Sequence, residues 1–231
     1  MKRLTLAMCA AALVLYACNS ETKSDTATGD TTTVAKTDTS NTPPPDPCAG
    51  QPAPDPSAMA GMDSSMMAKW MEFATPGDAH KVLADDAGEW EGETTMWMAP
   101  DAPPMKSKVK AVHTMILGGR YQAGEYTGCM MGQPFEGKSV IGYNNATKKY
   151  TSSWVDNQGT GIMIMEGTYN PATKTVNFSG NCVDPMTGKN MKMREEFVIV
   201  DNNTRKMSMY SPDMKTGKEY KGMEIVLTRK K

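Results

Sequence analysis

Few residues in this chain have the types and spacing that catalysis or metal binding requires. His80 and His113 are the only two His, and no H-x-x-x-H or C-x-x-C pattern occurs, so the usual spacings of zinc ligands are missing. A G-x-S-x-G nucleophile elbow and a glycine-rich phosphate loop are also absent from the sequence. We therefore predict no catalytic residue, no metal ion and no cofactor. Whether the protein is an enzyme stays open, with a non-enzymatic role favoured.

His113 is the strongest candidate for a chemical role. It shares one face of a predicted strand with Val109, Ala111 and Met115. Inside a barrel it could ligate haem, as in haem-binding ten-stranded barrels, or act as a general base. A hydrogen-bonded or surface His is the alternative.

Further side chains could line a cavity. The aromatic and thioether candidates are Tyr126, Trp154, Met163 and Met165, and the charged ones are Glu125 and Arg194. Such a wall, with a few polar groups, suits an amphiphilic small molecule. The same residues could equally form plain core or charged surface. The strand near residues 190–200 is ambiguous, because alternation places either Arg194 or Glu195 inside.

A Met-rich stretch precedes the strands. On a helix, Met59, Met62 and Met66 would share a face with Trp70. Thioethers bind Cu(I), which makes these residues a weak copper candidate. The alternative is a short amphipathic helix that lies on the barrel, with Met filling irregular gaps.

Short β-favouring runs alternate with turn clusters such as Asn144–Thr147 and Asn170–Thr173. This spacing predicts an all-β antiparallel meander that curls into a barrel. A helix should begin near Thr75 and end at Gly88. We expect about ten strands, which leave room for an internal cavity, at 89–98, 106–117, 120–130, 135–143, 148–156, 160–169, 174–183, 190–200, 204–210 and 218–229.

Several motifs in this region occur in the order of one bacterial family. They include Gly88-x-Trp90-x-Gly92, Gly118-Gly119-Arg120-Tyr121, Gly142-Tyr143-Asn144 and Asp184-Pro185-x-Thr187-Gly188. From about residue 76 to 230 the chain resembles domain of unknown function fifteen-seventy-nine. The resemblance implies a lipocalin-like (calycin-type) barrel and no known activity. In similar barrels the G-x-W Trp lies beneath an Arg of the last strand, which here implies Trp90 and Arg229; we expect Arg229 to matter more for stability than Arg205, which we place near a turn.

The N-terminus resembles that of a bacterial lipoprotein. Lys2 and Arg3 precede a short apolar run that ends in Leu15-Tyr16-Ala17-Cys18, a pattern similar to a lipobox. It implies cleavage after residue 17, acylation of Cys18 and attachment to a membrane. Asn19 favours the outer membrane of the cell envelope over the inner membrane.

The remaining segments follow from composition. We divide the chain into a signal peptide (1–17), a Thr/Ser/Pro-rich disordered tether (18–58), the Met-rich amphipathic segment (59–75) and the barrel domain (76–231). The net charge of −1 gives no basic surface for nucleic acid. In an oxidising compartment Cys129 and Cys182 could form a disulfide, although separate thiols are favoured.

These features predict a membrane-anchored lipoprotein whose barrel binds a small hydrophobic or amphiphilic ligand. The alternatives are an enzyme that acts on a lipid or small acid inside the barrel, or a structural envelope lipoprotein without an internal ligand. The sequence does not choose among these three.

Overall fold

The computed structural model describes residues 47–52, 55, 57, 61 and 63–231. Within it, Pro54–Lys231 form one compact unit. Cys18, Met59, Met62 and most of the predicted tether lie outside the described residues, so their predicted roles are not addressed by the fold.

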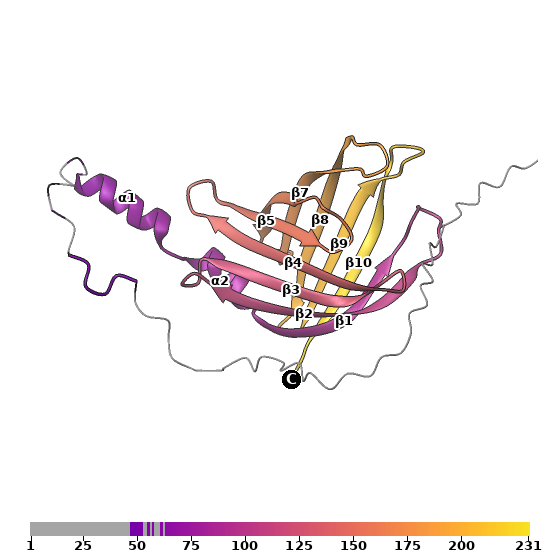
Figure 1. Ribbon diagram of the computed structural model, residues 1–231, viewed down its shortest axis with the longest axis horizontal. Helices are drawn as coiled ribbons and strands as arrows, with labels where there is room; N and C mark the ends of the chain where they lie inside the picture. The colour runs from indigo at the N-terminus through magenta and orange to yellow at the C-terminus, as the bar shows by residue number, and fades with distance from the viewer. Residues whose placement is uncertain (1–46, 53–54, 56, 58–60, 62) are drawn as a thin grey trace, which may run out of the picture. The chain divides into compact units, whose positions relative to one another are not determined.

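Ten antiparallel strands form a closed barrel in which each strand pairs with its sequence neighbours and β1 pairs with β10 (Figure 1). This confirms the predicted all-β, ten-stranded barrel. The strands are β1 (Gly88–Met96), β2 (Met105–Ile116), β3 (Tyr121–Met130), β4 (Gln133–Asn144), β5 (Lys149–Asp156), β6 (Met163–Asn170), β7 (Thr175–Val183), β8 (Asn190–Asp201), β9 (Thr204–Pro212) and β10 (Glu219–Arg229).

Side-chain alternation sets the inner and outer faces of the barrel. Val176 and Phe178 on β7 are buried while Asn177 between them is exposed, as a strand with one apolar face requires. The strand boundaries match the predicted ranges to within about three residues at the ends. The pairing register shifts at two irregularities, between Lys221 and Met223 on β10 and between Ile199 and Asp201 on β8.

Helix α2 (Asp78–Ala84) covers one end of the barrel, which we call the closed end. Its N-cap is Gly77 rather than Thr75, and the Gly77 N–H donates to His80 Nδ1 at 3.0 Å. Leu83 is buried in the core, and the Tyr150 hydroxyl donates to the Ala79 carbonyl at 2.8 Å. These contacts fix the helix and the loop after it against the interior.

Helix α1 (Ser64–Ala74) buries none of its residues. Asp63 caps it by accepting from the N–H groups of Ser65 and Met66. Trp70 and Phe73 remain largely exposed, with their ring centroids 6.0 Å apart. Asn145 Nδ2 donates to the carbonyls of Glu72, Phe73 and Thr75, which ties the end of α1 to the β4–β5 turn. No helix among the described residues is long and apolar enough to cross a membrane.

Candidate functional site

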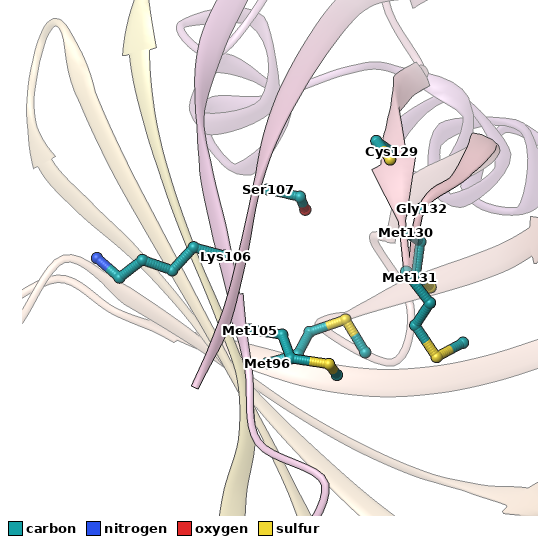
Figure 2. Close-up of a pocket in the computed structure, with 8 residues that line it drawn as sticks. All are labelled: Met96, Met105, Lys106, Ser107, Cys129, Met130, Met131 and Gly132. Carbon is teal, nitrogen blue, oxygen red and sulfur yellow. The ribbon is translucent and has the colours of Figure 1, made fainter. Parts of the chain in front are cut away.

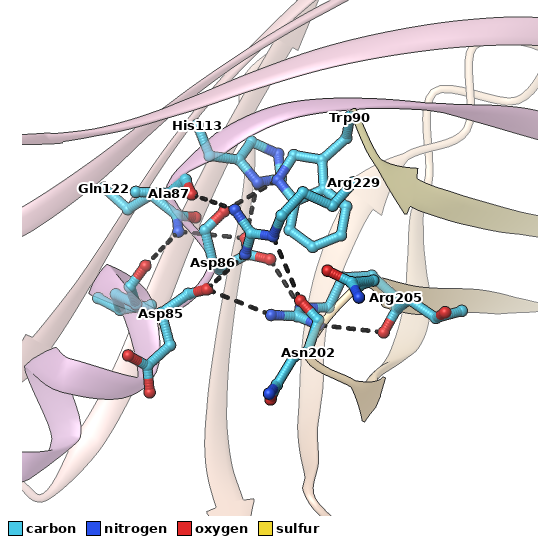
Figure 3. Close-up of polar contacts among 12 residues, drawn as sticks. Asp85, Asp86, Ala87, Trp90, His113, Gln122, Asn202, Arg205 and Arg229 are labelled. Atoms are coloured by element: carbon cyan, nitrogen blue, oxygen red, sulfur yellow. Dashed lines mark hydrogen bonds and ion pairs between the residues drawn. The ribbon is translucent and has the colours of Figure 1, made fainter. Parts of the chain in front are cut away.

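A buried polar network occupies the closed end (Figure 3). We call Asp86, His113, Gln122 and Arg205 the closed-end network. Asp86, in the loop between α2 and β1, accepts from Arg205 Nε at 2.8 Å and from Gln122 Nε2 at 3.2 Å, and lies 2.6 Å from His113 Nδ1. All four residues are buried. A buried carboxylate with a guanidinium and an amide as partners is satisfied, so this network holds the end of the barrel together.

Two arginines lie over the faces of Trp90, which is itself almost fully buried. The guanidinium carbons of Arg205 and Arg229 lie 4.7 and 4.2 Å from its ring centroid. Trp90 pairs directly with Arg229 across β1 and β10, and the Arg229 guanidinium donates to the Ala87 and Asp85 carbonyls. The structure thus brings Trp90 and Arg229 together.

Arg205 lies next to the turn at residues 202–203, as predicted, but it is more deeply buried than Arg229. We therefore expect loss of Arg205 to cost more stability than loss of Arg229, which reverses the order expected from the sequence. Arg205 is 2% exposed and holds the buried ion pair with Asp86. It shares the inner face of β9 with Met207 and Met209, since Leu227 and Ile225 of β10 pair with Arg205 and Met207.

His113 links the network to the middle of the barrel. Its Nε2 lies 3.0 Å from the Tyr126 hydroxyl. Its Nδ1 is close to Asp86 but is not aligned with it for a regular hydrogen bond. Burial, together with the charges of Asp86 and Glu195, raises the pKa of Tyr126. The phenol therefore stays protonated.

Beyond Tyr126, the inner face of the barrel becomes accessible. At the closed end, inward residues such as Trp90, Ala111 and Leu227 are at most 2% exposed. Toward the opposite end several inward side chains are only half-buried, although Met193 next to Glu195 is buried. The half-buried side chains are Met96, Met130, Phe135, Trp154, Met163, Met191, Met209 and Met223. We call this region the open half. Solvent thus reaches large apolar residues on this part of the inner face, although most of them also pack against the buried core clusters.

Glu195 on β8 faces this open half. Its cross-strand neighbours are Phe178 and Met209, both on the inner face. Among the described residues it has no hydrogen-bond or ion-pair partner. Burial raises its pKa to about 7. A carboxyl group in apolar surroundings without a partner is unfavourable for folding, which is the signature of a group kept for interaction with something else.

Two of the predicted cavity residues point away from the interior. Glu125 is on the outer face of β3, where it forms an exposed ion pair with Lys138 at 3.1 Å. Arg194 is on the outer face of β8 and pairs with Glu196 and Glu219. The side chain of Glu195, not that of Arg194, faces the interior. The prediction that Arg194 lines a cavity was therefore wrong.

The other predicted liners lie on the inner face. Tyr126 and Trp154 stand edge to face with centroids 5.1 Å apart, and Trp154 Nε1 donates to Asp156 at 2.7 Å. Met163 borders the open half, whereas Met165 is 2% exposed and belongs to the core. His113 is buried in the closed-end network.

Cys129 and Cys182 are not bonded to each other. Cys129 is on the outer face of β3 and exposed, while Cys182 packs against the inner cluster from β7. The thiols lie on opposite faces of strands that are separated by β4, β5 and β6, so a disulfide between them is sterically excluded.

The predicted copper candidate is not tested, because Met59 and Met62 lie outside the described residues. In the described part of the chain, no group of three or more His, Cys, Asp or Glu side chains is placed to hold a metal ion. Met66, the one described member of the copper candidate, lies on α1 and is 49% exposed.

A sequence profile described as "Protein of unknown function (DUF1579)" matches residues 75–229. The chain belongs to this family. The match confirms the resemblance found in the motifs, and it covers the whole barrel together with α2. None of the curated proteins matches the chain.

Two solved structures share the fold of this family member. One is the crystal structure of Rv2717c from M. tuberculosis, with a TM-score of 0.52 and 14% identity over 68% of this chain and 100% of that one. The other is the S-type phycobiliprotein lyase CPES from Guillardia theta, with a TM-score of 0.50 and 9% identity over 70% of this chain and 97% of that one. At these identities the likeness concerns the barrel fold alone.

Sequence analysis did not identify Asp86, Gln122 and Arg205 as site residues, and it named Glu195 only as the alternative to Arg194. The sequence holds a signal for two of these residues, because Gln122 shares a face of β3 with Tyr126 and Arg205 shares a face of β9 with Met207 and Met209. Asp86 had none, because it lies in a loop and meets its partners only in the folded chain.

Proposed function

We propose that the barrel binds a small, largely apolar molecule in its open half, with the polar end of that molecule at Glu195 and Tyr126. The observation that carries the proposal is the contrast between the sealed inner face at the closed end and the half-exposed inner face beyond Tyr126. Thioether and aromatic walls with a few polar groups are typical of sites for amphiphilic ligands.

Glu195 and Tyr126 define what the polar end of the ligand should offer. Tyr126 keeps its proton, because burial raises its pKa, and its neutral hydroxyl, which also contacts His113 Nε2, can donate or accept. Glu195 donates when protonated and accepts when ionised, and its pKa of about 7 allows both forms near neutrality. A hydroxyl or carbonyl group, or a weakly basic nitrogen that Glu195 can protonate, fits this pair. A second fixed carboxylate does not fit, because it would face the Glu195 carboxylate without a counter-charge.

A binding titration with N-phenyl-1-naphthylamine, a probe that fluoresces in apolar surroundings, tests the proposal. We suggest the full chain with Cys18→Ser, so that no attached acyl chain competes for the site. The wild-type barrel should give saturable fluorescence, and Met209→Trp should abolish it by filling the open half next to Glu195. Val226→Trp on the exposed outer face of β10 is the matched control and should leave binding unchanged. Equal binding by Met209→Trp and Val226→Trp would contradict an interior site.

A second candidate function is an enzyme that uses Glu195 as general acid or base on the bound molecule. A carboxyl group whose pKa is raised to about 7 has the proton affinity that such a role needs. Glu195→Gln separates the two candidates once a ligand is known: a binding protein keeps the ligand unaltered in both forms, whereas an enzyme converts it only with Glu195 present.

We further propose that the mature protein is anchored in the bacterial cell envelope, in the outer membrane, through acylated Cys18. The support is the lipobox-like sequence and the Asn that follows it. Labelling with a fatty-acid analogue should mark the wild-type chain and not Cys18→Ser, and only the wild type should partition into the detergent phase. Labelling that persists in the variant would contradict acylation at this residue.

A further inference from the structure

Strands β2 and β3 separate before they reach the open rim of the barrel. Their pairing runs from Ile116–Tyr121 to Val109–Gly128 and stops there. Beyond that point Met105–Lys108 pair only with β1, and Cys129 and Met130 pair only with β4. The wall therefore opens laterally between two strands, each of which keeps its other neighbour.

A pocket of about 290 Å³ occupies this opening, and we call it the rim pocket (Figure 2). Five of its eight lining residues carry sulfur. The lining residues are Met96, Met105, Lys106, Ser107, Cys129, Met130, Met131 and Gly132. Figure 2 shows the thioethers of Met96 and Met105 next to each other on one side and Met131 extended on the other.

Packing does not account for these methionines. Met105 is 39% exposed and Met131 is 62% exposed, so neither fills a gap in the core. A second rim pocket of about 300 Å³, between the β7–β8 and β9–β10 turns, offers a comparison. It is lined by Asp184, Lys189, Lys192 and Asp213 among others, and only Met191 and Met214 contribute sulfur. Sulfur-bearing residues thus make up more of the lining of the rim pocket than of the second rim pocket.

The donor set of the rim pocket selects one class of ligand. Thioethers and thiols are soft donors, which favour Cu(I) over magnesium, calcium or manganese. The lining has neither a carboxylate nor an imidazole to suit harder ions. Lys106, the one cation in the lining, is paired with Glu93 on the outer face at 2.8 Å, which holds its charge away from the sulfur atoms.

We propose that the rim pocket binds a soft monovalent metal ion, Cu(I), through the thioethers of Met96, Met105 and Met130. Met131 and Cys129 stand at its edge as further donors. This site uses neither the Met59, Met62 and Met66 stretch nor Glu195, although Met96 and Met130 also belong to the open half. Met side chains have three rotatable bonds, which lets them close around an ion from opposite sides of the opening.

A competition experiment tests the site. The full reduced chain is titrated anaerobically with Cu(I) against bathocuproine disulfonate, and native mass spectrometry with Ag(I) gives the stoichiometry with an ion that does not change oxidation state. Met105→Leu with Met130→Leu conserves volume and removes two thioethers. We expect the affinity to fall about tenfold or more. Met191→Leu with Met214→Leu, in the second rim pocket, is the matched control and should bind as the wild type does.

Two further measurements show whether the thioethers bind the ion in the folded wild-type protein and whether the Cys129 thiol is required. The ε-methyl NMR signals of Met96 and Met105 should shift when Ag(I) is added, while those of Met66 and Met71 on α1 should not. Cys129→Ser should retain most of the affinity. Binding that survives the Met105/Met130 double substitution, binding that disappears with Cys129→Ser alone, or the absence of binding to the wild type would each overturn the proposal.

Discussion

At the closed end of the barrel the charged interior side chains have partners, whereas in the open half a carboxyl group faces apolar neighbours without one. Asp86 contacts Arg205, Gln122 and His113 at one end; Glu195 lies between Phe178 and Met209 at the other. Both regions use the same strands and the same alternation of faces. The difference is the basis of our proposal that the closed end stabilises the fold and that the open half binds a ligand, because an unpartnered polar group in apolar surroundings weakens a fold.

The largest expected effect concerns the arginines at the closed end. Arg205→Ala leaves the buried Asp86 carboxylate without its guanidinium, which should lower the free energy of unfolding by about 3–5 kcal/mol. Arg229→Ala removes a partly exposed guanidinium from Trp90 and should cost about 1–2 kcal/mol. Urea unfolding measures both. Arg194→Ala, an exposed ion pair on the outer face, is the control and should change stability by less than about 1 kcal/mol. An equal loss for Arg205→Ala and Arg229→Ala would remove the distinction between these two arginines.

Two methionines on the inner face of β6 allow the packing of the core to be compared with that of the open half. Met165 is 2% exposed and packs in the core, while Met163 borders the open half. Met165→Ala should destabilise the fold by about 2–4 kcal/mol, because it leaves a cavity in close-packed surroundings. Met163→Ala should cost about 1 kcal/mol or less, since Met163 is only partly buried where it packs against the core cluster. Similar losses from these two variants in thermal or urea unfolding would mean that the interior is uniformly packed.

Glu195 should make stability depend on pH in a window that is set by its raised pKa. Burial raises the pKa of this carboxyl group from its ordinary value of 4.5 to about 7 in the folded chain. Because the folded chain keeps this proton to higher pH, stability should fall as the pH rises through that window and stay constant above it. Glu195→Gln should remove this loss, with a gain over the wild type on the order of 2 kcal/mol at pH 8 that vanishes near pH 4. Glu125→Gln on the outer face is the control. A wild-type minus variant difference that is independent of pH would show that Glu195 is not buried.

The sequence predicted the barrel well because its turns and its one-sided strands carry strong local signals. Val176 and Phe178 alternate with exposed Asn and Ser, which leaves one possible inner face for β7. Strand β8 carries charges on both faces, and its register depends on its partners and on the irregularity near Asp201, so alternation alone could not choose between Arg194 and Glu195.

The polar network was harder to predict because its members are far apart in the sequence. Asp86 meets Arg205 across 119 residues and Gln122 across 36. No periodicity spans a loop and two non-adjacent strands, so only the closed barrel brings them together. The rim pocket likewise could not be predicted from the sequence, because it depends on the register at which β2 and β3 separate.

The central claim is that the open half of the interior is accessible while the closed end is sealed. The most direct test places single cysteines on the inner face, in a chain whose five native cysteines (Cys9, Cys18, Cys48, Cys129 and Cys182) are replaced by Ser. Met209→Cys lies in the open half beside Glu195, and Leu227→Cys lies at the closed end, where Leu227 is 2% exposed. The account predicts that a small thiol reagent modifies Cys at 209 in the native protein and modifies Cys at 227 only after unfolding. Equal protection of both positions in the native protein would show a filled interior and contradict the account.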